Sequence, residues 1–284
     1  MNANSPQKTP VINEWLKEAT LQLAGIGIAS AKLDSELILA HTLRKPRTFL
    51  YAHADDYLDT RYQEIANARL QLRLDRVPLA YIIGHKEFYG RPFKVTNATL
   101  IPRPETETLI SLLGKLLPKN LSLLDEAPRR LVDVGTGSGC LGITAKLEFP
   151  ELDVSLLDIS RHALKVATSN ARSLNANVHL QISNLLADFP FPINYILANL
   201  PYVDPTWELS PELKHEPAEA LFATDSGLHL IKKLIISART SLVSGGLLLL
   251  EADMRQLDDI RRFGADHGFK EVRREQLCIV LQRI

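Results

Sequence analysis

Residues 130–139 join an apolar run, Arg130-Leu-Val-Asp-Val134, to a glycine-rich run, Gly135-Thr-Gly-Ser-Gly139. The apolar run has the length and β-branched character of a buried strand, and residues 140–149 after the glycines favour a helix. Glycines at such a junction let the backbone approach a ligand closely, and the helix N-terminus attracts polar or negative groups. The segment therefore predicts a ligand-binding loop between a strand and a helix.

Apolar runs typical of strands recur along the chain and alternate with amphipathic helical segments. The further strands are expected at residues 154–157, 178–182, 193–198, 247–252, 270–274 and 278–282, and a loop is expected at 118–128. Such alternation predicts a parallel sheet with helices on both faces. We therefore predict an α/β fold, with a doubly wound, seven-stranded and mostly parallel sheet in a domain of residues 105–284.

The chain before this domain has a different character. After a polar lead-in of ten residues, helical periodicity runs from residue 11 to about 83, which predicts a small helical domain of residues 1–80. The residues expected to face its core include Leu33, Leu37, Ile38 and His41 in one helix and Tyr62, Ile65 and Leu72 in a later one.

Residues 81–104 are predicted to form a β-hairpin linker. Gly84 and Gly90, with aromatic residues between them, are typical of a hairpin. Pro102 and Pro104 exclude a helix interior or a central strand, so the hairpin should continue into a stiff extended connector.

The overall composition excludes several classes of function. The 284 residues carry a formal net charge of +0, which gives no bulk attraction to nucleic acid or to an anionic membrane. Two cysteines offer no disulfide framework, and no apolar run approaches the ~20 residues of a membrane-spanning helix. These features predict a cytoplasmic protein that binds no membrane and no nucleic acid stably.

An acidic residue supports an adenosine-containing cofactor. Asp158 ends the second predicted strand, where a carboxylate can accept hydrogen bonds from both ribose hydroxyls. The loop lacks the usual G-x-G-x-x-G spacing of dinucleotide sites and is preceded by Asp133, a pattern that resembles the first motif of class I methyltransferases that use S-adenosylmethionine. A nicotinamide dehydrogenase and a loop that merely turns the chain are the alternatives.

A second motif, Asn199-Leu-Pro-Tyr202, follows the strand expected at 193–198. The asparagine amide offers an acceptor and two donors, and Pro201 restrains Leu200 so that its carbonyl points in a fixed direction. Tyr202 can present a flat apolar face. Together these groups can hold a planar –NH2 group.

Three segments narrow the acceptor. The N-x-P-Y motif is shared with adenine and cytosine methylases, but Tyr81-Ile-Ile-Gly84, Glu87-Phe-Tyr-Gly90 and Ile101-Pro-Arg-Pro-Glu-Thr-Glu107 closely resemble the PrmC/HemK family. The resemblance extends to Asp225-Ser-Gly227 and covers nearly the whole chain. It implies a Rossmann-like methyltransferase that methylates the side-chain amide of the glutamine in the Gly-Gly-Gln motif of peptide-chain release factors.

The resemblance also implies roles for individual residues. Asn199 and Tyr202 are the expected catalytic residues, and no metal is expected. The substrate-binding residues are expected to be Asn199, Leu200, Pro201, Tyr202, Arg103, Glu105 and Thr106. The cofactor-binding residues are expected to be Gly135, Thr136, Gly137, Ser138, Gly139, Asp158, Asn184, Leu185 and Asn199. The expected partner is a release factor, which the helical domain is expected to bind, and the enzyme is expected to be a monomer.

The sequence departs from the family pattern at three places. Leu200 replaces the usual proline, and Asn184-Leu185 stands where an acidic residue and an aromatic ring usually lie near the adenine. The polar loop often seen before the last strand is missing. A working but altered pocket is expected, and two other functions stay open: a nucleic-acid amino methyltransferase of the rRNA adenine type, and a non-catalytic cofactor-binding homologue.

Overall fold

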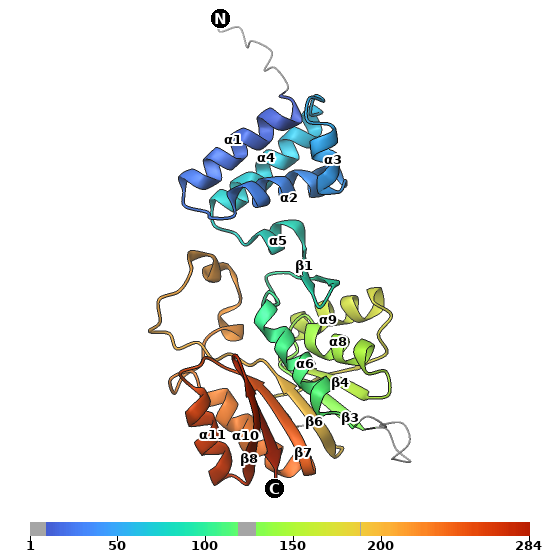
Figure 1. The fold of residues 1–284 in the computed structure, drawn as a ribbon, viewed down its shortest axis with the longest axis vertical. Helices are drawn as coiled ribbons and strands as arrows, with labels where there is room; N and C mark the ends of the chain where they lie inside the picture. Colours follow the sequence, from blue (N-terminus) through green and yellow to red (C-terminus); the bar gives the residue numbers. More distant parts are fainter. Residues whose placement is uncertain (1–9, 119–128, 188) are drawn as a thin grey trace, which may run out of the picture. The chain divides into compact units, whose positions relative to one another are not determined.

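A computed structural model describes residues 10–118, 129–187 and 189–284 (Figure 1). They form two compact units. The helical unit contains the chain up to Gly84 together with Ser210–His215, and the sheet unit contains His85–Leu209 and Glu216–Ile284. The loop expected at 118–128 lies outside the described residues except for Pro118.

The helical unit is a small bundle. Its helices are α1 (Ile12–Gly25), α2 (Ala31–Leu43), α3 (Arg47–Ala52), α4 (Thr60–Leu74) and α5 (Leu79–Ile83). Trp15, Leu23, Ile38 and Leu50 are among the apolar side chains that form its core. None of the helices in the described part of the chain is long and apolar enough to cross a membrane.

The expected inward face of α4 is wrong at all three positions, and that of α2 is right at Ile38, which is buried, but wrong at Leu33. Leu33, Tyr62, Ile65 and Leu72 are all exposed, by 43%, 41%, 37% and 46%. The buried positions include Asp34 on α2 and Arg73 on α4, whose Oδ2 and Nε lie 2.7 Å apart. A buried charge is tolerated only when it is paired, and here the pair joins residues far apart in the sequence, so apolar periodicity misplaces the α4 face and part of the α2 face.

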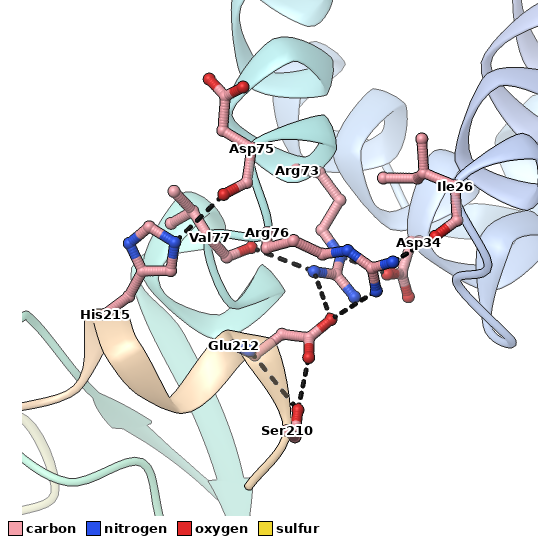
Figure 2. A network of polar contacts seen from close by, with 9 residues as sticks. All are labelled: Ile26, Asp34, Arg73, Asp75, Arg76, Val77, Ser210, Glu212 and His215. Carbon is pink, nitrogen blue, oxygen red and sulfur yellow. Dashed lines mark hydrogen bonds and ion pairs between the residues drawn. The ribbon is translucent and has the colours of Figure 1, made fainter.

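The chain enters the helical unit a second time at Ser210–His215, where η2 (Pro211–His215) forms. Figure 2 shows the polar network at this point. Oε1 of Glu212 lies 3.2 Å from Arg76 Nη1 and 3.4 Å from Arg73 Nη1. His215 Nε2 lies 3.1 Å from the carbonyl oxygen of Asp75. These contacts hold the segment to the end of α4.

The ion pairs of Glu212 are expected to hold the segment Ser210–His215 in place, and this effect can be measured. Burial opposes ionisation, but hydrogen bonds from Ser210 and Arg76 and the charge of Arg73 lower the pKa of Glu212 to about 2. Stabilisation from this carboxylate is therefore complete above its ordinary value of 4.5 and is lost as the pH falls through about 2. We expect Glu212→Gln to release the segment and to raise the rate of tryptic cleavage after the exposed Lys214 by about tenfold.

Limited trypsinolysis with mass spectrometry measures this cleavage. Glu208→Gln is the matched control, because Glu208 is an exposed carboxylate just outside the segment. Equal cleavage rates after Lys214 in Glu212→Gln, Glu208→Gln and wild type would show that the ion pairs anchor nothing.

The sheet unit contains the predicted seven-stranded sheet, in the order β5-β4-β3-β6-β7-β9-β8. The strands are β3 (Arg130–Val134), β4 (Asp153–Asp158), β5 (His179–Ile182), β6 (Ile193–Ala198), β7 (Leu242–Glu251), β8 (Phe269–Glu275) and β9 (Cys278–Arg283). Neighbours from β5 to β7 are parallel, and β9 is antiparallel to both β7 and β8. The predicted fold class is confirmed.

Helices cover both faces of this sheet (Figure 1). Those that pack on it are α6 (Glu107–Leu116), α8 (Cys140–Glu148), α9 (Arg161–Ser173), α10 (His229–Ser241) and α11 (Leu257–Asp266), and the unit also has the short helices η1 (Pro104–Thr106) and η3 (Ala218–Ala220). Leu131 on β3 packs in one core with α6 and α8, whereas Val132 packs in a second core with α10 and α11. Successive strand residues point to opposite faces, so one short strand supplies both cores.

A two-stranded hairpin of β1 (His85–Phe88) and β2 (Arg91–Lys94) begins the sheet unit. The hairpin starts later than the expected residue 81, because residues 79–83 form α5 and the helix stops at Gly84, whose φ is +78°. Asn170 on α9 fixes the hairpin. Its Oδ1 accepts from Lys94 N at 2.8 Å, and its Nδ2 donates to the carbonyls of Lys94 and Ser138.

Candidate functional site

The carboxyl ends of four neighbouring parallel strands bring the site together. Gly135 follows β3, Asp158 ends β4, Asn199 follows β6 and Glu251 ends β7. Parallel strands place these ends at one edge of the sheet, which is where open α/β sheets bind ligands. Three of these four positions were predicted from the sequence.

The glycine loop has the left-handed backbone that its composition predicts. Gly135, Gly137 and Gly139 have φ values of +71°, +56° and +83°. The loop is tied to the buried Asp133, whose Oδ2 accepts from Thr136 Oγ1 at 2.6 Å and from Gly142 N at 2.9 Å. Burial raises the pKa of Asp133 to about 6, against these hydrogen bonds. A Cβ on Gly137 would meet no atom within 4 Å, so the backbone there is open to a ligand.

Asp158 lies directly beside this opening. Its Oδ2 accepts from Gly137 N and its Oδ1 from Ser160 N, each at 2.8 Å. A carboxylate has about four lone-pair positions, so two remain for a pair of ligand hydroxyls. Burial raises the pKa of Asp158, and hydrogen bonds from Ser160 and Gly137 oppose the rise. These free acceptor positions fit the two ribose hydroxyls of an adenosine.

Asp158→Ala is expected to weaken the binding of S-adenosylmethionine about 10²-fold, because two hydrogen bonds to a charged group are lost. Asp158→Asn, which keeps the shape and one acceptor oxygen, should lose less. Isothermal titration calorimetry measures both constants. Wild-type affinity in the alanine variant would show that Asp158 does not bind the cofactor.

The departures at 184–185 lie just after β5. Ser183 N donates to the carbonyl of Asp158 at 3.0 Å, which brings the start of the segment next to Asp158. Asn184 is exposed, and Leu185 has a φ of +55°, an uncommon conformation for leucine. The turn buries Leu186, which is 4% exposed, in the core with α10. The segment keeps one polar and one apolar side chain beside Asp158.

The departure at Leu200 has a packing reason. Its side chain is 4% exposed and belongs to the core that α10 and α11 cover. A Cβ on Gly135 would lie 2.8 Å from Leu200 Cδ2, so the first glycine of the loop leaves room for this leucine. The cofactor loop and the N-L-P-Y motif therefore touch.

Two of the three residues carried over from the R-P-E-T segment have defined partners. Arg103 forms an ion pair with Glu216, whose Oε2 also accepts from Ile101 N at 3.0 Å. Thr106 is 2% exposed, and its Oγ1 accepts from Asn199 Nδ2 at 3.1 Å. Glu105 is exposed. The structure thus brings Thr106 to the asparagine of the N-L-P-Y motif.

Glu251 is a site residue that was missed. It is 1% exposed, and its Oε1 accepts from Asn199 Nδ2 at 3.0 Å and from Tyr202 Oη at 3.2 Å. Its signal was a lone carboxylate after four leucines in a strand expected to be buried, where an unpaired charge would be costly.

Gln256 was also missed. It is 4% exposed, and its Nε2 donates to the carbonyls of Tyr202 and Ser226 at 2.8 and 2.7 Å. This side chain fixes the end of the N-L-P-Y motif against the Asp225–Gly227 turn. Nothing in its local sequence distinguishes it from an ordinary surface glutamine.

Comparisons with known proteins agree on one family. The models for a PrmC N-terminal domain and a methyltransferase small domain match residues 14–84 and 111–258. A release factor glutamine methyltransferase from Coxiella burnetii is 37% identical over 265 residues, which are 92% of each chain. One from Escherichia coli K12 is 35% identical over 267 residues, 91% of each chain. A solved methyltransferase structure from Pyrococcus furiosus has a TM-score of 0.52 at 16% identity, over 76% of this chain and 97% of that one, and supports the fold.

Proposed function

The chain belongs to the family of release factor glutamine methyltransferases, and we propose that it methylates a glutamine side chain of a release factor. The acceptor is the amide nitrogen of the glutamine in the Gly-Gly-Gln motif. The observation that carries the proposal is the position of Asn199, at the same sheet edge as Gly137 and Asp158. An acceptor for a planar –NH2 group thus lies beside a loop that fits adenosine.

S-adenosylmethionine is the proposed cofactor, and when bound it supplies an electrophilic methyl group on a sulfonium. The loop Gly135–Gly139 and Asp158 hold its adenosine and methionine parts, and Asn184 and Leu185 line the adenine. The open backbone at Gly137 and the spare lone pairs of Asp158 support this assignment.

The acceptor motif activates the substrate by orientation and electrostatics. An amide nitrogen is a poor nucleophile because its lone pair is delocalised into the carbonyl. Asn199 Oδ1 and the Leu200 carbonyl accept the two amide hydrogens, which points the nitrogen along one direction and stabilises the positive charge that develops on it. Tyr202 flanks the glutamine side chain. One amide hydrogen then leaves as a proton to water.

The remaining parts of the proposal concern the partner. The helical unit binds the release factor, while Arg103, Glu105 and Thr106 lie along the glutamine-bearing loop. If the helical unit contributes affinity, the KM for a whole release factor should be much lower than the KM for a Gly-Gly-Gln peptide. We place the reaction in the cytoplasm and propose a monomeric enzyme.

A labelling experiment tests the function. The protein is incubated with radiolabelled S-adenosylmethionine and, separately, with release factor, with rRNA and with a release factor that carries glutamate in place of the motif glutamine. Label on the normal release factor alone is expected. Label on rRNA would indicate a nucleic-acid enzyme instead, and no label on any acceptor would indicate a non-catalytic homologue.

A further inference from the structure

Both hydrogens of the Asn199 amide are already engaged inside the protein. Nδ2 donates to Thr106 Oγ1 at 3.1 Å and to Glu251 Oε1 at 3.0 Å. A primary amide nitrogen has only two hydrogens, so neither is left for a ligand. The oxygen Oδ1 is on the opposite side of the amide and is the atom that remains available.

The chemistry of the partners selects this orientation. An asparagine amide has nearly the same shape after a rotation that exchanges its oxygen and nitrogen, so only its hydrogen-bond partners distinguish the two states. A hydroxyl such as that of Thr106 can donate or accept, and therefore fits either state. An ionised carboxylate can only accept. The exchanged state would place Asn199 Oδ1 against Glu251 Oε1, two acceptors at about hydrogen-bond distance.

We propose that Glu251 is a positioning residue, which as a carboxylate holds the Asn199 amide with Oδ1 directed to the substrate. The inference rests on the proposed function, in which Oδ1 accepts a hydrogen of the glutamine amide. Glu251 also accepts from Tyr202 Oη at 3.2 Å, so one carboxylate ties together the two polar side chains of the N-L-P-Y motif.

The surroundings of Glu251 make its charge sensitive to pH. Burial raises the pKa of Glu251, and hydrogen bonds from Thr106, Tyr202 and Asn199 oppose the rise while the charge of Glu105 adds to it. The other titratable neighbours include the Tyr202 phenol and two thiols, and burial raises the pKa of all three groups, so they stay protonated near neutral pH. Cys278 lies opposite Glu251 on β9, and burial raises the pKa of Cys140 on α8 to about 12.

Protonation of Glu251 should undo the selection. A protonated carboxyl group can donate to Asn199 Oδ1, so the exchanged amide becomes acceptable and presents its donors to the substrate. The positioning is therefore complete above the raised pKa of Glu251 and is lost as the pH falls through it. Because the Asn199 amide has nearly the same shape in both states, protonation of Glu251 should change the orientation of the amide without unfolding the protein.

Nuclear magnetic resonance of the enzyme without cofactor or substrate tests this directly. The side-chain 15N–1H signals of Asn199 are assigned by their absence in Asn199→Ala. In wild type they are expected to shift with a midpoint above 4.5, the ordinary value for glutamate. In Glu251→Gln, which keeps the shape, that transition should disappear. A wild-type signal that does not titrate, or an unchanged transition in Glu251→Gln, would overturn the proposal.

Steady-state kinetics supply the second readout. Glu251→Gln is expected to lower kcat about tenfold and Glu251→Ala about 10²-fold, since a small misplacement of an orienting group has effects of this size. The KM for release factor should change less than twofold, and the acid limb of the wild-type pH profile should be absent in Glu251→Gln. Glu151→Gln, an exposed carboxylate, serves as the control. Wild-type kcat in Glu251→Ala would contradict the proposal.

The two experiments separate this inference from the proposed function. The pH titration of the Asn199 signals needs no substrate, so it tests the role of Glu251 even if release factor is not the acceptor. Methyl transfer to release factor with no Asn199 titration would keep the function and remove the role of Glu251.

Discussion

Asn199→Ala is expected to lower kcat for release factor methylation by about 10³-fold, while the Kd for S-adenosylmethionine stays within about twofold. The variant removes the oxygen that is proposed to accept a glutamine hydrogen and to stabilise the developing charge, and losing one preorganised group that stabilises transition-state charge costs about 10²–10³ in rate in other enzymes. The donors to Thr106 and Glu251 are removed with it. The glycine loop and Asp158 are joined by their own hydrogen bond, so although Asn199 was also expected to touch the cofactor, most of the cofactor site is kept.

Discontinuous methylation assays measure kcat, and calorimetry measures the Kd for S-adenosylmethionine. Asn97→Ala is the control, because Asn97 is an exposed asparagine in a turn of the same unit. It should leave both constants unchanged. An Asn199→Ala enzyme with more than about a tenth of wild-type kcat would show that orientation by this amide is not the source of catalysis.

Gly227→Ala is expected to lower the free energy of unfolding by about 3 kcal/mol or more and to remove most methylation activity. Gly227 follows Asp225 and Ser226 in a turn where all three residues have positive φ, and its own φ is +82°. A Cβ there would lie 1.9 Å from the carbonyl oxygen of Tyr202 and 2.4 Å from Gln256 Nε2. A backbone atom cannot rotate away, so Tyr202 and the acceptor motif must shift.

Gly90→Ala separates this steric effect from the cost of the backbone conformation. Gly90 has a similar φ of +72°, but a Cβ there would meet no atom within 4 Å. It should cost only about 1 kcal/mol. Chemical denaturation of both variants measures the difference, and equal destabilisation would mean that the contact with Tyr202 is not what requires glycine at 227.

Much of the sheet unit could be predicted because its signals are local. A parallel strand buried on both faces is a short apolar run, and a glycine loop is visible as glycines after it. The site residues Gly137, Asp158 and Asn199 each end or follow such a run, so their place at one sheet edge followed from the order of strands and helices. The hairpin boundary was less accurate, because Leu79–Ile83 is apolar in either conformation and only Gly84 ends the helix.

The helical unit was predicted less well for a physical reason. Its bundle buries Asp34 on α2 against Arg73 on α4, and in the sequence α3 and its two flanking loops lie between these helices. Periodicity assigns polar residues to the solvent, and so it placed Leu33 and Leu72 inward. The return of the chain at Ser210–His215 could not be read from the sequence either, since Glu212 looks like any surface glutamate until Arg73 and Arg76 are beside it.

Residue patterns were therefore sufficient to predict the fold class and to place the glycine loop and Asn199 at one edge of the sheet. They left the Asn199 amide free to present either its oxygen or its nitrogen. Thr106, Tyr202 and Glu251 come from three separate segments, and only the packed sheet edge brings them to within hydrogen-bond distance. The carboxylate of Glu251 is buried at that edge and has no contact with solvent, so it accepts hydrogen bonds from Asn199 and Tyr202 instead. A hydrogen bond between distant segments is a property of the folded chain, and in our proposal it decides which atom of the amide meets the substrate.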